Sequence, residues 1–564
     1  MVLTFNKQYL NKLLTSHTLK NVWLNTITMK KLTTFYFFLT ASLVFGQFVD
    51  LGQKGFGGTG DDFLKRYEDT VHNTNFYVGS SNSNASFDKG EDSRGGNDIW
   101  IVKTDSANNF LWDKTIGGSG EDNGRYCMII NDKIYILGNS TSPISGEKSM
   151  DSFGEYDVWL IVLNLDGNIL WQKQYGGALN DFLNSMIYLS NGNLLLGGLS
   201  KSLPSSTIGN KTSPNKGGDD FWLVEINPLN GDIIQQKTIG SVNDEEFNFL
   251  GTDFSDKIIL KGGALSGATG DKADAGYGIK NMWVIMLDQQ LNILQDKCFG
   301  GGNELGFSGD VGFTNNAYYF SVTTSSGVSG NKTAPNRGSY DYWVVKTDTN
   351  LNILWDQSYG GSLSDYTYQL FFSEWNKLLL SGNSISGING NKTAPNFGLT
   401  DIWFLVLNES DGSIVAQETF GGSSFDSGYL KKSIRNETKL YIESNSQSGT
   451  SSNKTTINHG GYDFWMVELD ASDFLATEKL DTEGASISVY PNPYSEQVNF
   501  KLEQLKEAVT LNIATLDGKI VHTQTIQPSN ENIEITWKPI STEQFLVYTI
   551  KGAKTNFTGK LVGF

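Results

Sequence analysis

Hydrophobic residues recur along most of this chain in short runs, each containing a tryptophan. Seven such tryptophans follow one another at intervals of 59 to 63 residues: Trp100, Trp159, Trp222, Trp283, Trp343, Trp403 and Trp465. Each run is rich in β-branched and aromatic residues, as in Tyr342-Trp343-Val344-Val345, and this composition predicts a β-strand. Regular self-similarity of this length predicts an array of supersecondary units that bury their apolar faces only by stacking on one another.

Three further strands are predicted in each repeat. A turn and an alternating return strand follow the tryptophan strand and end, in all but one repeat, in Gly-Gly, as Ile353 to Tyr359 does before Gly360. A near-continuous apolar run, such as Lys377 to Leu380, precedes the tryptophan and suits a strand covered on both faces. A weaker strand, such as Tyr366 to Phe372, lies between these two. Four meandering strands make a propeller blade, and glycine is expected where a side chain would collide with the neighbouring blade.

The two ends of the repeat region complement each other. The last repeat has its tryptophan strand, Phe464 to Leu469, but no return strand, whereas Phe48 to Phe56 is a return strand with no tryptophan strand before it. An N-terminal strand that completes the last blade would close a ring of seven and cover its open edges. We therefore predict an all-β fold with a seven-bladed β-propeller over residues 47–475. An open β-solenoid is the alternative.

The N-terminal region predicts export. Met29-Lys30-Lys31 begins a basic segment, Phe35 to Phe45 is apolar, and Gly46 offers a small residue for cleavage. We expect a signal peptide over residues 29–46 and a true start at Met29, with residues 1–28 a mis-assigned start. The apolar stretch is too short to span a membrane, so a transmembrane protein is not expected; an uncleaved anchor is the alternative.

The C-terminal region has a different pattern. After a polar linker over residues 476–486, residues 487–564 contain short alternating strands that predict a small Ig-like β-sandwich. The segment opens with Tyr490-Pro491-Asn492-Pro493 and closes with Lys560-Leu561-Val562.

On these motifs, Ile487 to Phe564 resembles the type A C-terminal sorting domain of the Bacteroidetes type IX secretion system. Two features depart from the family: no glycine precedes Phe545, and the chain ends in Gly563-Phe564 instead of a basic residue. The resemblance implies that the type IX machinery and a sortase-like protease are partners. It also implies a secreted protein or one attached to surface lipopolysaccharide. An ordinary accessory sandwich is the alternative.

Charge narrows the choice of partners. The formal net charge is −18, and it becomes about −23 once the five lysines of residues 1–46 are removed. An acidic chain repels nucleic acid and anionic lipid, so neither is expected as a partner. The two cysteines, Cys127 and Cys298, lie in different repeats and are expected to be packed, unpaired side chains.

Few residues have the pattern of a catalytic or metal site. Beyond residue 46 only His72, His459 and His522 are present, without metal-ligand spacing, and no nucleophile elbow or phosphate loop occurs. No catalytic residue and no metal ligand is assigned, and imidazole catalysis is not expected. Substitutions confined to one repeat would mark an active site; Ser241, Asn281 and Leu305 are the visible outliers.

Two series of acidic residues follow the repeat. The series that follows the Gly-Gly elements contains Asp62, Asp122, Asp181, Glu245, Asp365 and Asp426. The series that precedes the tryptophans contains Asp98, Asp157, Asp220, Asp341, Asp401 and Asp463. Because they repeat, we expect them to cap turns through backbone amides. The alternative is a ring of oxygen ligands for a hard cation such as calcium, the one cofactor considered.

Polar loops before the tryptophan strands are candidate binding elements. Three copies of Gly-Asn-Lys-Thr supply the candidate binding residues Asn210, Lys211, Asn331, Lys332, Asn391 and Lys392. Such side chains on a rigid scaffold could hydrogen-bond sugar hydroxyls. The alternative is an Asn/Pro turn with a purely structural role.

The sequence thus favours an exported binding or adhesion protein whose propeller presents a surface to a glycan or to a protein. One alternative is a polysaccharide lyase or hydrolase that uses carboxylates, tyrosine or lysine in the channel. Another is a purely structural surface component. Whether the protein is an enzyme stays open, with the absence of a catalytic motif favouring a binding role.

Overall fold

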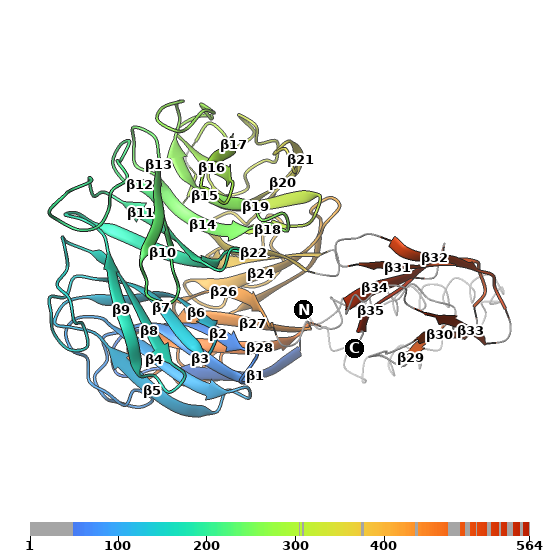
Figure 1. The fold of residues 1–564 in the computed structure, drawn as a ribbon, viewed down its shortest axis with the longest axis horizontal. Helices are drawn as coiled ribbons and strands as arrows, with labels where there is room; N and C mark the ends of the chain where they lie inside the picture. The colour runs from blue at the N-terminus through green and yellow to red at the C-terminus, as the bar shows by residue number, and fades with distance from the viewer. Residues whose placement is uncertain are drawn as a thin grey trace, which may run out of the picture. The chain divides into compact units, whose positions relative to one another are not determined.

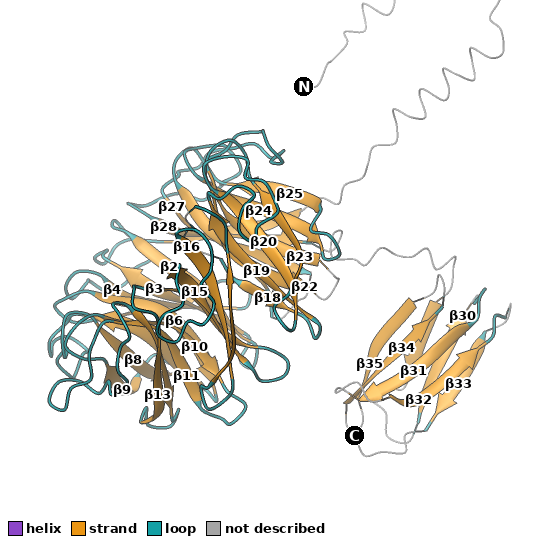
Figure 2. Ribbon diagram, turned by 90° about the horizontal axis from the view of Figure 1, so that it is seen from above, coloured by secondary structure: helices purple, strands orange, loops and turns teal. Residues whose placement is uncertain are grey.

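The computed structural model describes residues 49–303, 305–306, 309–373, 377–434, 438–471, 486–490, 497–503, 505–515, 520–529, 532–538, 545–552 and 556–562. Every regular element in these ranges is a β-strand (Figures 1 and 2). Strands β1 to β28 form seven antiparallel sheets of four strands each. Their inner strands lie around the middle of a ring, as Figure 1 shows, so the predicted seven-bladed propeller is confirmed.

Each of the first six blades consists of four consecutive strands, with the first innermost (Figure 1). The first three blades are β2 (Asp62–Asp69), β3 (Thr74–Ser81), β4 (Asp98–Asp105), β5 (Phe110–Ile116); β6 (Asp122–Ile130), β7 (Lys133–Ser140), β8 (Asp157–Asn164), β9 (Ile169–Tyr175); and β10 (Asp181–Tyr188), β11 (Leu194–Ser200), β12 (Asp220–Ile226), β13 (Ile233–Ile239). The next three are β14 (Glu246–Thr252), β15 (Ile258–Leu265), β16 (Lys280–Leu287), β17 (Ile293–Phe299); β18 (Val311–Phe313), β19 (Ala317–Thr324), β20 (Asp341–Asp348), β21 (Ile353–Tyr359); and β22 (Asp365–Ser373), β23 (Lys377–Ser384), β24 (Asp401–Asn408), β25 (Ile414–Phe420).

The seventh blade joins the two ends of the repeat region. It contains β26 (Asp426–Lys432), β27 (Lys439–Ser446), β28 (Asp463–Asp470) and, as its outer strand, β1 (Val49–Phe56). Gly55 pairs with Trp465, and the Trp465 indole donates a hydrogen bond of 3.0 Å to Gln53 Oε1. The N-terminal strand therefore closes the ring as predicted.

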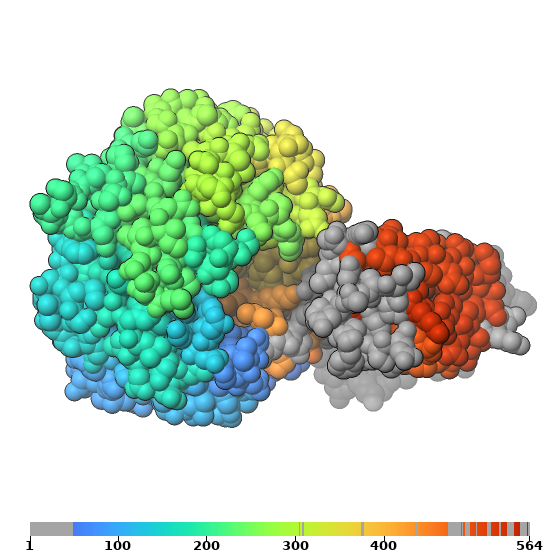
Figure 3. Space-filling model, viewed as in Figure 1, coloured from blue at the N-terminus to red at the C-terminus, as the bar shows by residue number. Residues whose placement is uncertain are grey.

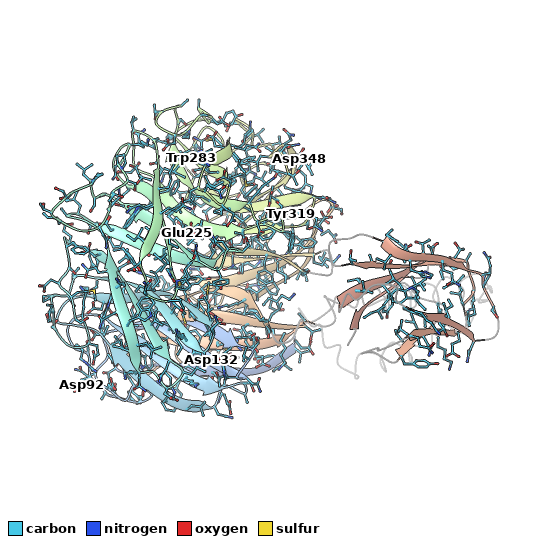
Figure 4. All side chains as sticks on the ribbon, in the orientation of Figure 1. Asp92, Asp132, Glu225, Trp283, Tyr319 and Asp348 are labelled. Atoms are coloured by element: carbon cyan, nitrogen blue, oxygen red, sulfur yellow. The ribbon has the colours of Figure 1, made fainter. Side chains whose placement is uncertain are left out.

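The core lies between the faces of consecutive blades. All seven repeat tryptophans are fully buried, and Trp159 of the second blade packs with Phe76 and Ile99 of the first. Figure 4 shows Trp283 within the packed part of the ring and Asp92, an exposed carboxylate, at its rim. Burial of both faces of the second and third strands of each blade explains their continuous apolar sequences.

The Gly-Gly elements lie where two close approaches occur. A Cβ atom at Gly421 would lie 1.9 Å from Asp401 Oδ1 of the same blade, and one at Gly422 would lie 2.5 Å from Ser448 Cβ of the next blade. Larger residues are thus excluded by the acidic residue before the tryptophan strand as well as by the neighbouring blade.

The C-terminal residues form two further sheets. One contains β29 (Ser486–Tyr490), β30 (Val498–Glu503) and β33 (Ile533–Trp537), in that order. The other has the order β32 (Ile520–Ile526), β31 (Val509–Thr515), β34 (Phe545–Lys551) and β35 (Asn556–Val562). Phe500 of the first sheet and Tyr548 of the second meet with ring centroids 5.1 Å apart, so the two sheets enclose a common core. Within the described residues no helix is long and apolar enough to cross a membrane.

Candidate functional site in the propeller channel

The central channel contains a cavity of about 630 Å³. Its wall is formed by the inner strands β2, β6, β22 and β26, which surround the middle of the ring in Figure 1. The space-filling view is hollowed near the centre of the ring (Figure 3). Cationic and tyrosine side chains dominate the polar lining: Lys65, Arg66, Tyr67, Tyr126, Tyr368, Tyr429, Lys431 and Lys432. The volume lies within the range of small-molecule sites.

Glu443, which is buried behind this wall, departs from the pattern of the repeat. In every blade one residue of the second strand pairs with the residue that follows the tryptophan, and in the seventh blade this residue is Glu443. In the other blades it is Val78, Leu137, Gly197, Lys261, Ser321 or Ser381. Glu443 is only 1% exposed. It accepts hydrogen bonds from the Arg66 backbone N–H, at 3.1 Å, and from the Tyr429 hydroxyl, at 3.3 Å. A buried carboxylate therefore links the seventh blade to the first.

Lys431 supplies the positive partner of Glu443. Its Nζ lies 3.9 Å from Glu443 Oε1 and 4.5 Å from the centroid of the Tyr67 ring, and it donates to the Arg66 carbonyl oxygen. The carboxylate and the face of the aromatic ring both favour a cation here. Lys431 is thus held at the cavity wall with its charge only partly compensated.

The neighbouring Arg66 is compensated more fully. Its guanidinium donates to Glu68 at 2.8 Å and to Asn75 at 3.1 Å, and it lies 3.8 Å over the Tyr441 ring. Arg66 therefore stabilises the first blade and its contact with β27, and little of its hydrogen-bonding capacity is left for a ligand.

Lys65 and Arg125, unlike Lys431 and Arg66, have no directly paired carboxylate in the described part of the chain. Among the described residues neither makes a hydrogen bond or an ion pair within 4 Å, and both are exposed to solvent. Although the Lys65 side chain reaches solvent in the channel, desolvation by the protein packed around it, followed by the positive charges of Lys431 and Arg125, lowers its pKa to about 8. Arg125 is the unpaired residue of a β-bulge in β6, the position that Tyr368 occupies in β22. The site thus contains like charges held near one another, with Glu443 as the carboxylate that acts on Lys65 in the opposite direction.

Four tyrosines complete the lining. Tyr67 and Tyr126 meet edge to face with centroids 5.8 Å apart, and Tyr368 and Tyr429 come from the sixth and seventh blades. Burial raises the pKa of all four phenols, so their hydroxyls stay protonated at neutral pH. The Tyr429 hydroxyl already donates to Glu443, whereas the other three can donate to a ligand, and ring faces are also available to it.

A second pair of charges, Lys261 and Asp310, lies next to the cavity, because the lining residue Gln369 donates a hydrogen bond to Asp310. Lys261, which is fully buried, donates to the Gly309 carbonyl at 2.9 Å. Burial lowers its pKa to about 7, and burial also raises the pKa of the nearby Asp310 to about 6. The fifth blade is the irregular one here, because β18 has three residues where other inner strands have seven to nine.

The three outliers noted in the sequence have local structural roles. Asn281 accepts the Tyr277 N–H at 2.7 Å, as the acids do at this position, and Leu305 is buried in the core between the fourth and fifth blades. The Ser241 hydroxyl donates to Glu245 at 2.5 Å. The charged departures from the repeat, Lys261 and Glu443, were not singled out by the sequence analysis.

The two acidic series meet at the junctions between blades. Asp181 accepts the Gly177 N–H at 2.7 Å, and Asp157 accepts the Phe153 N–H at 2.5 Å, so the prediction that these acids cap turns is confirmed. Burial, together with the other carboxyl group of the pair, raises the pKa of Asp157 to about 7 and that of Asp341 to about 6. The described residues contain no cluster of three or more acidic, histidine or cysteine ligands, and a calcium site stays a prediction.

The loop asparagines attach each loop to the preceding blade. Asn391 accepts the Gly360 N–H at 2.9 Å and donates to the Ser358 carbonyl at 3.0 Å, and the other two make the same pair of bonds. Asn210 bonds Gly176 and Gln174, and Asn331 bonds Gly300 and Cys298.

The loop lysines point inward. Lys211, Lys332 and Lys392 are at most 1% exposed, and their ammonium groups lie 5.7 to 5.9 Å from the centroids of Trp222, Trp343 and Trp403. These contacts account for the loop residues as structural groups. A role of the six residues in ligand binding stays a prediction.

The remaining residues noted in the sequence are placed as follows. Cys127 and Cys298 are both buried and unpaired, as predicted. The Tyr490 hydroxyl donates to Glu534 at 2.8 Å, Leu561 is buried, and Lys560 and Val562 belong to β35. Pro491, Asn492, Pro493, the signal peptide and the linker up to residue 485 lie outside the described residues.

The fold defines a seven-bladed β-propeller followed by a small β-sandwich. Residues 488–562 match the family model of the secretion system C-terminal sorting domain, which confirms the resemblance seen in the sequence. The C-terminal sandwich is therefore a type IX sorting domain, and the type IX machinery exports this chain to the cell surface or the medium.

Comparison with solved structures gives only distant similarities. PorZ, an essential bacterial surface component of the type IX secretion system of Porphyromonas gingivalis, is 10% identical, with 90% of this chain and 60% of that chain covered and a TM-score of 0.36. Polysaccharide lyase Uly1 is 9% identical over 73% of this chain and 90% of that chain, with a TM-score of 0.40. The PL25 ulvan lyase is 8% identical over 72% and 97%, with a TM-score of 0.39. We infer nothing about activity from these values. A search of curated proteins finds no significant match.

Proposed function

We propose that this chain is an exported binding protein whose propeller takes up a glycan in the channel cavity. The observation that carries the proposal is the cavity of about 630 Å³ lined by four protonated tyrosines. Ring faces and fixed hydroxyl donors suit a ligand with apolar sugar faces and many hydroxyl groups. The sorting domain, which directs export, supports a ligand outside the cell.

The function is tested by titrating the full-length protein with a panel of oligosaccharides and measuring its melting temperature at each concentration. A ligand at 100 times its dissociation constant stabilises the folded state by about 2.7 kcal/mol, which raises the melting temperature. Tyr368→Ala is expected to remove the shift. Tyr366→Ala is the matched control, because Tyr366 lies on the same strand but stacks on Tyr340 and does not line the cavity. A shift that survives Tyr368→Ala would place the ligand elsewhere.

An enzyme acting on polysaccharide is the second candidate, and Lys65 is the observation that favours it. A lysine with a pKa of about 8 inside a ligand-sized cavity can act as a general base near neutral pH, as a lyase requires. A hydrolase needs two carboxyl groups beside the scissile bond, and Glu68 is the only carboxylate in the described lining. Product analysis of the same mixtures decides: unsaturated sugar products that disappear in Lys65→Met would establish a lyase.

A further inference from the structure

We propose that the channel cavity selects an acidic oligosaccharide, whose carboxylate or sulfate group lies against Lys65, Arg125 and Lys431. This inference rests on the proposed function, because it names the class of glycan that the same cavity takes. Nothing in the sorting domain or in the repeat itself requires a charged ligand. The inference comes from the charges that depart from the repeat.

The balance of charge in the wall is the first reason. The cavity is lined by the cationic residues Lys65, Arg66, Lys431 and Lys432, and Arg125 is the neighbour of the lining residue Tyr126. Glu68, which pairs with Arg66, is the one carboxylate in the described lining, and Glu443 is buried behind it. The whole chain has a net charge of −18, so a group of cations in its channel runs against the overall composition. Cationic side chains gathered in a channel focus the electrostatic field and raise the local concentration of an anion more than the same charges spread over a convex surface do.

The lack of partners is the second reason. The buried cation of the same wall, Arg66, is paired with Glu68 at 2.8 Å. Lys65 and Arg125 have no such partner among the described residues, and the two charges repel each other. An anionic group placed between them would relieve this repulsion and supply the missing hydrogen-bond acceptors.

The geometry of the donors fits an acidic sugar. A guanidinium can bind a carboxylate or sulfate through two parallel hydrogen bonds, and an ammonium can add further bonds from another direction. Tyr126 and Tyr368 lie along the same cavity and can donate to the hydroxyl groups of adjoining sugar units. The negative surface of the protein disfavours a nucleic acid, whose long phosphate backbone would have to cross it.

Calorimetric titration of the full-length protein with matched pairs of ligands tests the inference. One arm compares trigalacturonate with galactotriose, and the other compares a sulfated κ-carrageenan tetrasaccharide with its desulfated, neutral form. We expect the acidic member of at least one pair to bind at least tenfold more tightly than its neutral partner. The arms distinguish a carboxylate ligand from a sulfate ligand. Equal affinity within both pairs would overturn the inference.

Variants assign the effect to the cavity. The double variant Lys65→Met and Arg125→Met is expected to reduce the ratio of acidic to neutral affinity by at least tenfold. Neither side chain has a partner to lose, so the variant is expected to fold with at least the wild-type melting temperature. Lys216→Met, an exposed loop lysine, is the control. An unchanged ratio in the double variant would contradict the inference.

Failure of the inference can be told apart from failure of the proposed function. If acidic and neutral sugars bind equally and Tyr368→Ala abolishes both, the cavity binds glycans without charge selection. If no sugar in either pair binds, or if binding survives Tyr368→Ala, the proposed function itself fails.

Discussion

Lys431 of the seventh blade extends over Tyr67 of the first, with its ammonium nitrogen 4.5 Å from the centroid of the ring. The contact crosses the junction at which the chain closes the propeller, and the buried carboxylate of Glu443 lies 3.9 Å from the same nitrogen. We therefore expect a change of charge at this place in the channel wall to act in opposite directions on stability and on affinity for the proposed acidic ligand.

Glu443→Gln removes the negative charge that faces the channel cations. The amide can still accept from Arg66, but Lys431 loses its ion pair. Because Lys431 is partly exposed and its charge is screened, we expect a loss of about 1 to 2 kcal/mol in the free energy of unfolding. Affinity for the acidic ligand is expected to rise. Urea unfolding and calorimetry measure the two effects, with the exposed Glu155→Gln as the control. A fall in acidic affinity would contradict the charge argument.

Acidic-ligand affinity is expected to depend on pH through Lys65. The pKa of this lysine is about 8 in the free protein, lowered by burial and by the charges of Lys431 and Arg125, with Glu443 acting in the opposite direction. A bound anion favours the charged form, so binding takes up a proton and weakens as the pH rises above about 8. Titrations at pH 7 and pH 9 measure this. Lys65→Arg, which stays charged, should abolish the dependence; an identical slope in that variant would show that another group titrates.

The carboxyl pairs at the blade junctions predict how stability varies with pH. Burial raises the pKa of Asp157 to about 7 and those of Asp341, Asp401 and Asp463 to about 6, above the value of about 3.9 in an unfolded chain. Their contribution to stability is therefore fully present below about pH 4 and is lost as the pH rises through 6 to 7. We expect a higher melting temperature at pH 5 than at pH 8.

Asp157→Asn tests the cause of this trend. Asn281 shows that an amide serves at the equivalent position, because it accepts the Tyr277 N–H at 2.7 Å. The variant should fold and should lose about 1 kcal/mol or more of the difference between pH 5 and pH 8. Calcium added at pH 8 tests the predicted cation site: a marked stabilisation that Asp157→Asn reduces would support it. Stability that rises from pH 5 to pH 8 without calcium would contradict protonated junctions.

The loop lysines predict a loss of stability without a loss of binding. The ammonium of Lys392 donates to the carbonyls of Ser386, at 3.0 Å, and Ala394, at 3.2 Å. Lys392→Met would leave these acceptors unpaired in a buried loop and should cost about 2 to 3 kcal/mol in urea unfolding. Lys216→Met, in a corresponding loop but exposed, should change stability by less than about 0.5 kcal/mol. Loss of glycan affinity in Lys392→Met, with stability unchanged, would instead assign the loop to the binding site.

The repeat made most of the fold predictable, and departures from it define the candidate site. Tryptophan spacing and the orphan return strand were sufficient to predict the seven blades and the closure of β1 on β28, because both follow from burial and edge pairing. The channel site could not be found in the same way. Its members come from strands hundreds of residues apart, as Lys65 and Lys431 do, and their proximity depends on ring closure.

One signal in the sequence would have pointed to the site. In each blade one residue of the second strand pairs with the tryptophan. When the seven second strands are aligned at the residue just before this one, Lys261 and Glu443 are the charged side chains at that position. The polar Asn-Lys-Thr loops were predicted as binding elements because they repeat on one rigid scaffold. In the structure the loop lysines pack against Trp222, Trp343 and Trp403, which gives the repetition a structural reason, and a role in binding stays a prediction.

The most direct test of an acidic glycan in the channel is protection of Lys65 from an amine-directed reagent, followed residue by residue by mass spectrometry. The full-length protein is labelled at pH 8 with and without a saturating amount of whichever acidic oligosaccharide binds more tightly. We predict that Lys65 reacts readily in the free protein and is protected at least tenfold by the ligand, while Lys216 reacts equally in both. Unchanged labelling of Lys65 at saturation would contradict binding in the channel.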